Sequence, residues 1–232
     1  SNYRVAGFTT EPDASALIEL GRRAGVPVVF DLGGGTLRGL EQWDLPHEPI
    51  VTNSLRAGYD VVTFSGDKIL GGPQSGILAG RAELIERMTA SPMMRALRCD
   101  KLTLAALSAT LNLYRLEPRA LQQALPTLRM MTESTEIVRA RAEALLAQLA
   151  PATQEKLGAL VTPTTSQAGS GALPVEELDS FGLACGEGHA QELARRLRLD
   201  DQQAVVGRIA RSAWCWICVR CVIRTCVHWR PR

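Results

Sequence analysis

One short segment constrains the fold of this chain more than any other: an apolar run that breaks into a glycine-rich loop carrying a single lysine. Residues 60–76 read DVVTFSGDKILGGPQSG. Val61, Val62 and Phe64 favour a buried β-strand. The glycines and the proline that follow Lys68 favour tight turns, in which a ligand can approach the backbone closely. The segment therefore predicts a lysine placed just beyond the end of a buried strand.

A second apolar strand ends in a carboxylate. Residues 27–30 lead directly into Asp31, and a run of glycines follows soon after. Open α/β sheets bind their ligands at the carboxyl ends of parallel strands, so we expect Asp31 and Lys68 at the same edge of a sheet. A lysine that condenses with an aldehyde and a carboxylate that faces a pyridinium nitrogen are the two groups that pyridoxal 5'-phosphate (PLP) requires. Ser65 is then a candidate donor to the cofactor phosphate, with a plain turn serine as the alternative.

Three stretches of the chain together resemble the bacterial selenocysteine synthase family, the L-seryl-tRNA(Sec) selenium transferases. They are SNYRVAGFT at the amino terminus, TFSGDKILGGPQSGILAG from Thr63, and RALRCDKLTLAAL from Arg95. The resemblance runs from Ser1 to about Ile209, and the SGDK-x-x-GGPQ-x-G block is its most specific part. It implies the fold-type-I architecture of PLP-dependent transferases: an α/β large domain with a mostly parallel sheet, here present in part, followed by a smaller α+β domain.

The resemblance also implies roles for the charged residues near the lysine. Lys68 is the residue that forms the Schiff base with PLP, and Asp67 beside it orients the lysine or assists proton transfer; a solvated loop carboxylate is the alternative for Asp67. Arg95 and Arg98 are spaced three apart, on one side of a predicted helical turn. Such a pair suits bidentate binding of an oxyanion, and the resemblance assigns it to the selenium donor. A solvated face or a subunit contact is the alternative for this pair.

The reaction implied by the resemblance converts L-seryl-tRNA(Sec) to L-selenocysteinyl-tRNA(Sec), with selenophosphate as the selenium donor and an aminoacrylyl intermediate. The family also implies a homo-oligomer. Two alternatives remain open: a PLP-dependent lyase of a small amino or sugar acid on the same scaffold, and a non-catalytic fragment. The formal net charge of +2 gives no global basic field, so a tRNA-binding surface is local or lies outside this chain. No apolar run approaches the length of a membrane span, and we expect a cytoplasmic protein.

The two ends of the chain are unusual. The abrupt start at Ser1, without an initiator methionine, favours an amino-terminal truncation. We expect residues 1–126 to be the carboxyl-terminal part of the PLP-binding large domain and residues 127–209 to be the small domain. Residues 210–232 hold four of the six cysteines and three of the four tryptophans, a pattern that superficially suggests zinc or an iron–sulfur cluster. In a shifted reading frame, however, the codons for residues 214–219 spell VLDLR, which resembles the family's last strand, so we interpret 210–232 as a frameshifted, non-native tail.

Overall fold

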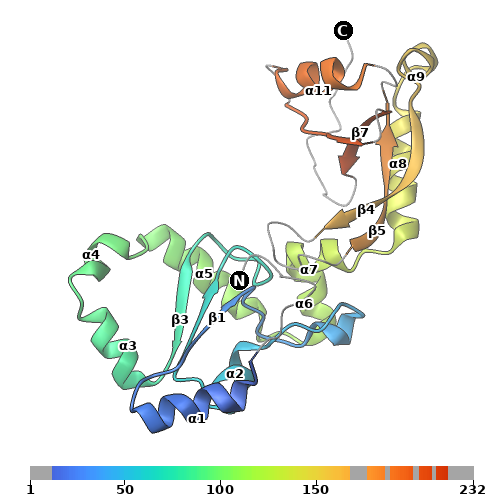
Figure 1. Cartoon of the computed structure of the whole chain (residues 1–232). Coiled ribbons are helices and arrows are strands. Elements are labelled where there is room, and N and C mark those ends of the chain that lie inside the picture. The colour runs from blue at the N-terminus through green and yellow to red at the C-terminus, as the bar shows by residue number, and fades with distance from the viewer. Residues whose placement is uncertain (1–11, 168–176, 186–188, 201–203, 211–212, 219–232) are drawn as a thin grey trace. The chain divides into compact units, whose positions relative to one another are not determined.

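The computed structural model describes residues 12–167, 177–185, 189–200, 204–210 and 213–218 (Figure 1). The chain divides into two compact units, and each is described by itself. The first contains the described residues up to Thr132, and the second begins at Glu133. Each unit combines a β-sheet with helices, so the α/β class predicted from the sequence is confirmed.

The first unit is built on a three-stranded sheet with the order β1-β2-β3. Its strands are β1 (Val29–Gly33), β2 (Val61–Ser65) and β3 (Gly76–Gly80). β1 and β2 are parallel, whereas β3 is antiparallel to β2. The accompanying helices are α1 (Ala14–Ala24), the 3-10 helix η1 (Leu40–Trp43), α2 (Val51–Ala57), α3 (Ala82–Thr89), α4 (Met93–Leu97), α5 (Lys101–Leu113), α6 (Pro118–Ala124) and α7 (Pro126–Met131). The strand carrying Asp31 and the strand preceding Lys68 are therefore the parallel pair.

One face of this sheet carries the hydrophobic core of the first unit. Leu32, Val62 and Phe64 pack there with Val51 of α2 and with Leu70, which follows β2. Val62 and Leu70 are completely buried. Burying a side chain of this size stabilises the fold by roughly 1.5–3 kcal/mol, so this core anchors both β2 and the start of the loop after it.

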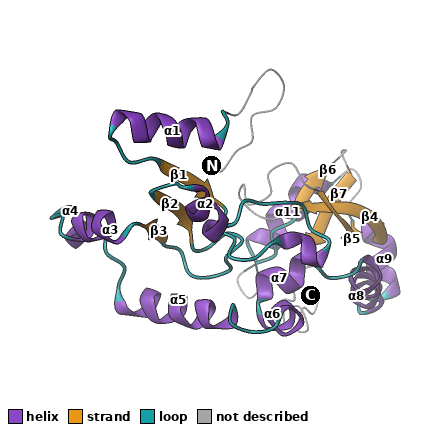
Figure 2. Ribbon diagram, turned by 90° about the horizontal axis from the view of Figure 1, so that it is seen from below, coloured by secondary structure: helices purple, strands orange, loops and turns teal. Residues whose placement is uncertain are grey.

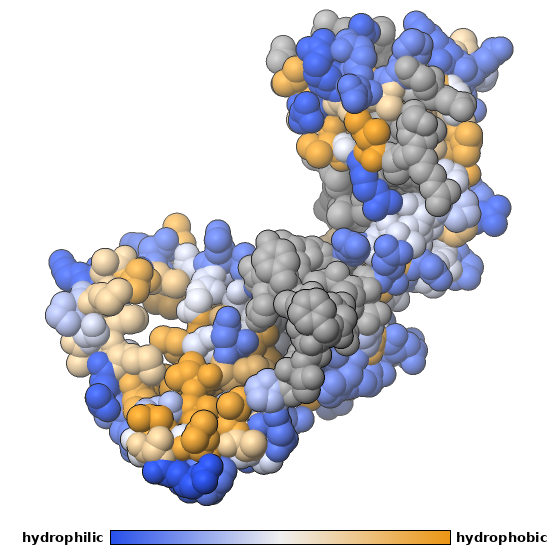
Figure 3. All heavy atoms as spheres, in the orientation of Figure 1, coloured by the Kyte–Doolittle hydropathy of each residue, from blue (hydrophilic) through white to orange (hydrophobic). Residues whose placement is uncertain are grey.

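The opposite face of the sheet is partly open. Side chains alternate along a strand, so Val29 and Asp31 point away from the core, as does Leu78 of β3. Val29 is 58% exposed and Leu78 is 43% exposed. Figure 2 shows α1 and α5 on opposite sides of the sheet, and hydrophobic residues gather over the sheet of this unit in the space-filling view of Figure 3. Among the described residues, Asp31 therefore lies on an exposed part of this face.

Asp60 joins the starts of β1, β2 and α3. Its carboxylate accepts a hydrogen bond from the Val28 amide at 2.8 Å and another from the Arg81 guanidinium at 2.9 Å. These hydrogen bonds, the one from the Val28 amide first, hold the pKa of Asp60 below its usual value. One carboxylate therefore fixes the amino-terminal ends of the parallel strands, opposite the edge at which Lys68 lies.

The second unit has a four-stranded sheet with the order β4-β5-β7-β6. Its core contains Leu149, Leu183, Cys185, Ala190 and Ala194. The elements are α8 (Thr135–Ala147), α9 (Pro151–Leu157), β4 (Leu160–Gln167), β5 (Glu177–Ala184), α11 (Ala190–Arg198), β6 (Arg208–Ala210) and β7 (Ala213–Cys218). β7 is antiparallel to both β5 and β6. This is the α+β composition that the sequence led us to expect for the carboxyl-terminal part.

Some expectations about the tail fall outside the described residues. β7 lies within residues 210–232, but Cys221 and Cys226 are not described, and the interpretation of this segment as a non-native tail stays a prediction. The described residues contain no group of histidine, cysteine and carboxylate side chains suited to hold a metal ion. In the same part of the chain, no helix has the length and apolar character needed to cross a membrane.

Candidate active site

Lys68 lies in a short loop that follows β2 and closes on itself through backbone hydrogen bonds. The Gly66 amide donates to the Ser75 carbonyl at 2.8 Å, and the Gly72 amide donates to the Gly66 carbonyl at 2.7 Å. Within the loop, the Gly71 amide donates to the carbonyl of Lys68 itself at 3.0 Å. These bonds satisfy the backbone groups of a tight turn and hold Lys68 directly beyond the carboxyl end of the strand.

Asp31 lies on the neighbouring strand, in register with Thr63 of β2. The Thr63 hydroxyl donates a 3.0 Å hydrogen bond to Oδ1 of Asp31. Ser65 is two residues beyond Thr63 on the same strand, so alternation places it on the same face of the sheet. Asp31, Thr63 and Ser65 therefore form a polar row on the partly open face. Thr63 is not among the site residues predicted from the sequence; its signal there is its alternation with the core residues Val62 and Phe64.

The loop after Asp31 packs directly against the end of β2. Gly35 has a φ of +71°, a conformation that residues with a Cβ rarely adopt. A Cβ at this position would lie 2.6 Å from Cδ2 of Phe64 and 2.8 Å from the backbone oxygen of Ser65. Because only glycine fits, the glycine run brings the segment after Asp31 against the residues that immediately precede the Lys68 loop.

The three lysines of the chain have different surroundings. They are Lys68, Lys101 and Lys156. Lys101 is the exposed first residue of α5, and Lys156 is exposed in the last turn of α9. Lys68 is half-buried and follows a strand that is parallel to the one bearing Asp31. Lys68 is accordingly the amine best placed to form a covalent bond with a cofactor at the carboxyl edge of this sheet.

The other predicted site residues are exposed. Asp67 lies in the loop beside Lys68. Arg95 belongs to α4, but this helix ends at Leu97, so Arg98 is the C-cap residue with extended backbone (φ −61°, ψ 139°) rather than part of the helical turn that the spacing predicted. Neither guanidinium forms an ion pair with a carboxylate among the residues that the structure describes. Both arginines are thus presented to solvent on a short segment after α3.

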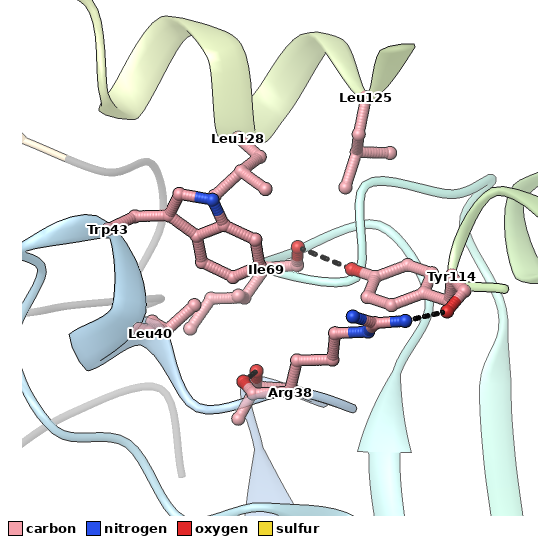
Figure 4. A pocket seen from close by; sticks show the side chains of 8 residues that line it. Arg38, Leu40, Trp43, Ile69, Tyr114, Leu125 and Leu128 are labelled. Carbon is pink, nitrogen blue, oxygen red and sulfur yellow. Dashed lines mark hydrogen bonds between the residues drawn. The ribbon is translucent and has the colours of Figure 1, made fainter. Parts of the chain in front are cut away.

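The predicted site residues line neither of two cavities in the described part of the chain. The first, about 10 Å³, lies behind the Lys68 loop between Arg38, Ile69 and Tyr114 (Figure 4). It has room for at most one water molecule. The second, about 450 Å³, lies in the second unit and is lined by Lys156 and His189, among others. The predicted site lies at the edge of a sheet, where Asp31 and Asp67 are exposed and Lys68 is half-buried.

The chemistry of the groups at this edge fits PLP. A half-buried amine suits the aldehyde carbon, a carboxylate held by a hydroxyl donor suits a protonated ring nitrogen, and a serine hydroxyl suits a phosphate. The flanking exposed Val29 and Leu78 are apolar, as the face of an aromatic ring requires.

Comparison with known proteins finds similarity along nearly the whole chain. Residues 1–223 match the protein family described as L-seryl-tRNA selenium transferase. The L-seryl-tRNA(Sec) selenium transferase of Escherichia coli O139:H28 (strain E24377A / ETEC) is 47% identical over 227 residues, which cover 96% of this chain and 48% of that protein. The protein of the same name from Shigella boydii serotype 18 (strain CDC 3083-94 / BS512) is 46% identical with the same coverage. The chain thus spans about half the length of the curated relatives it matches.

Among solved structures, the chain is similar to D-glucosaminate-6-phosphate ammonia-lyase, with a TM-score of 0.53. The similarity covers 89% of this chain and 47% of that one, at 16% sequence identity. At this low identity the likeness concerns the fold alone.

Proposed function

The chain belongs to the L-seryl-tRNA selenium transferase family, and from this premise we propose that it serves the PLP-dependent conversion of L-seryl-tRNA(Sec) to L-selenocysteinyl-tRNA(Sec). One structural observation carries the proposal. Of the three lysines, the half-buried Lys68 is the one that lies beyond a strand parallel to the Asp31 strand, at their common carboxyl edge.

Each polar residue at this edge has a separate task in the proposed reaction. When bound, PLP supplies a ring that accepts negative charge from the substrate Cα. Asp31 keeps the ring nitrogen protonated, and Thr63 holds the Asp31 carboxylate in place. Ser65 donates to the phosphate. Lys68 would hold the cofactor covalently until the amino group of the substrate takes its place, and the released lysine amine would then move protons at the substrate Cα and at the departing β-oxygen.

Three further charged residues complete the proposed machinery. Asp67, next in sequence to Lys68, orients the lysine amine or accepts a proton from it. Arg95 and Arg98 bind the anionic selenium donor, selenophosphate. Their exposure and their lack of a carboxylate partner in the described part of the chain support this role, because a bound oxyanion replaces the solvent around a guanidinium with charge-assisted hydrogen bonds.

The proposed assembly is a homo-oligomer that works in the cytoplasm, where aminoacyl-tRNA is used. α5 supports the oligomer, because none of its residues is buried and its Leu102 and Leu104 are 74% and 55% exposed. Large exposed apolar side chains of this kind are typical of interaction surfaces.

The lyase alternative rests on the fold alone. A D-glucosaminate-6-phosphate ammonia-lyase shares the fold at 16% identity, whereas the selenium transferases are 46–47% identical along nearly the whole chain. The sequence similarity therefore favours the selenium transferase.

One experiment separates the proposal from both alternatives. The chain is incubated with PLP, seryl-tRNA(Sec) and selenophosphate, and both the visible absorbance of lysine-bound cofactor and the selenium content of the tRNA are measured. Lys68→Ala is compared with Lys101→Ala as a matched control. We expect absorbance and selenium transfer in the wild type and in Lys101→Ala, and neither in Lys68→Ala. A Lys68-dependent band with ammonia release from a small amino acid, but no selenium transfer, would favour the lyase. Absence of a Lys68-dependent band would favour the non-catalytic fragment.

A further inference from the structure

A tyrosine from a distant part of the chain donates a hydrogen bond to the backbone of the Lys68 loop. Tyr114 is the C-cap residue of α5. Its hydroxyl donates a 3.0 Å hydrogen bond to the backbone carbonyl of Leu70, two residues after Lys68, and lies 3.5 Å from the carbonyl of Ile69. Figure 4 shows this hydroxyl directed at the backbone of the loop. The bond adds an external anchor to the backbone bonds that close the loop.

The hydroxyl of Tyr114 stays a donor at every pH of interest. Burial of the ring raises the pKa of Tyr114 to about 12, although the nearby charge of Arg38 acts in the opposite direction. The phenol therefore keeps its proton, and the carbonyl of Leu70 is never faced by a phenolate that would repel it.

Arg38 fixes Tyr114 in turn. One of its terminal nitrogens, Nη2, donates to the carbonyls of Tyr114 at 2.7 Å and of Leu116 at 2.8 Å. These are carbonyls at the end of a helix, which have no partner within the helix and attract a cation. One guanidinium therefore caps α5 and at the same time defines the position of the tyrosine.

Arg38 also belongs to the segment that begins at Asp31. Between them lie the glycine run and Thr36, which is buried. The Thr36 hydroxyl donates to the carbonyl of Arg38 at 2.6 Å, and the Val51 amide donates to the carbonyl of Thr36 at 3.1 Å. The backbone around Arg38 is thereby tied to the start of α2, so the guanidinium projects from a fixed base.

We propose that Arg38 and Tyr114 are positioning residues, which together set the place of the Lys68 amine relative to the Asp31 carboxylate. The connection runs from the Asp31 segment through Arg38 to Tyr114, and from there to the Lys68 loop. This inference rests on the proposed function, in which Lys68 and Asp31 hold the two ends of one cofactor ring. Bond formation to a fixed ring requires the amine within about 0.5 Å of its place, and an anchor on the loop backbone limits its movement.

The test compares Tyr114→Phe and Arg38→Met with a matched control. Tyr59→Phe removes a phenolic hydroxyl from the same core, in which the Tyr59 ring stacks on Phe30 with centroids 4.8 Å apart. The first measurement is amide hydrogen exchange of residues 66–72 in the chain without cofactor. We expect exchange there to be about ten-fold faster in Tyr114→Phe, because a buried carbonyl loses its donor, and unchanged in Tyr59→Phe.

The second measurement is the pH titration of the visible absorbance of lysine-bound PLP. The group that titrates is the Lys68 nitrogen bonded to the cofactor, and a displaced Lys68 changes the position of this nitrogen relative to the ring. We therefore expect the midpoint to shift in Tyr114→Phe and in Arg38→Met but not in the control. Arg38→Lys, which keeps the charge and one donor, should restore part of the wild-type value. General destabilisation would instead accelerate exchange throughout the first unit and leave the midpoint in place.

The two hypotheses fail in different ways. Unchanged exchange of residues 66–72 in Tyr114→Phe would overturn the positioning role, whether or not the chain binds PLP. Faster exchange with an unchanged titration midpoint would also overturn it, because the anchor would then not affect the amine. Absence of any Lys68-dependent absorbance in the wild type would refute the proposed function, while the exchange measurement would still report on the anchor.

Discussion

Replacing Gly35 with alanine tests how the two loops of the site are brought together. The backbone of Gly35 has a φ of +71°, and the added methyl group would lie 2.6 Å from Cδ2 of Phe64 and 2.8 Å from the carbonyl oxygen of Ser65. The Ser65 oxygen belongs to the backbone of β2, so the clash is not relieved by turning a flexible side chain. We expect Gly35→Ala to push the segment after Asp31 away from the end of β2.

The magnitude follows from two separate costs. A left-handed backbone conformation costs an alanine roughly 1–2 kcal/mol, and an overpacked methyl group costs a further 1–3 kcal/mol or so. Gly25 provides the matched control: it has a φ of +66° as well, but nothing lies within 4 Å of an added Cβ. Gly25→Ala should therefore show only the first cost, and Gly35→Ala should lose about 2–5 kcal/mol in total.

Urea unfolding followed by circular dichroism measures both losses, and titration with PLP followed by absorbance measures the effect on the site. We expect Gly35→Ala to bind PLP about ten-fold more weakly or worse, because Ser65 and the loop after it are displaced, and Gly25→Ala to bind it as the wild type does. Equal losses of stability in the two variants, together with unchanged PLP affinity, would refute the close packing of the two loops as the basis of the site.

Three further substitutions test single contacts. Asp60→Ala should lower the free energy of unfolding by about 2 kcal/mol at neutral pH. Because the pKa of Asp60 is depressed in the folded state, this contribution is complete above the unfolded-state pKa near 4 and disappears as the pH falls through the folded-state pKa. Urea unfolding midpoints of variant and wild type that differ equally at pH 2 and pH 7 would contradict this prediction. Thr63→Val removes the hydroxyl that donates to Asp31 and should weaken PLP binding about five-fold in an absorbance titration, whereas Thr63→Ser should not. Equal PLP affinities of the two variants would disprove the role of Thr63 in orienting the Asp31 carboxylate. Asp100→Ala removes the N-cap of α5, whose carboxylate accepts hydrogen bonds from two backbone amides at 2.7 and 2.9 Å, and should lower the free energy of unfolding by about 1 kcal/mol. Urea unfolding and hydrogen exchange of the α5 amides measure the loss, and Asp100→Ser should recover most of it.

The sequence predicted the elements around the site because their signals are local. The apolar runs before Asp31 and Lys68 and the glycines after them mark strand ends over a few residues. Helix ends carry the same kind of signal: Gly25 and Gly58 in the sequence predict the ends of two helices, and α1 and α2 stop there, with φ of +66° and +116°. Glycine at such a position is a strong local signal, because other residues avoid this conformation.

The contacts that support the site were not predicted, because they join residues far apart in the sequence. The hydrogen bond from Thr63 to Asp31 spans 32 residues, and that from Arg38 to Tyr114 spans 76. From the sequence, residues 101–116 predict one largely apolar helix that packs in the interior or against a partner subunit, and Tyr114 is simply a part of it. The helix ends at Leu113 and has no buried residue, so the interior alternative is wrong.

Strand prediction failed where composition opposed it. β5 reads ELDSFGLA, and its glutamate, aspartate and glycine are all uncommon in strands. Pairing with β7 and packing of Leu183 in the core outweigh those local preferences. The apolar run from Val205 to Ile209 predicts a strand, but the observed strand starts only at Arg208.

The central claim is that Lys68 is the lysine that binds PLP covalently, and peptide mapping tests it most directly. The 232-residue chain is incubated with PLP, reduced with borohydride and digested, and the peptides are analysed by mass spectrometry. The chain has two other lysines that PLP could modify instead. One of them, Lys156, lines a cavity of about 450 Å³ in the second unit. We predict that the reduced cofactor is found on the peptide containing Lys68 and that Asp31→Ala lowers its yield. Modification mainly at Lys156 or Lys101, or equal modification of all three lysines, would contradict the account.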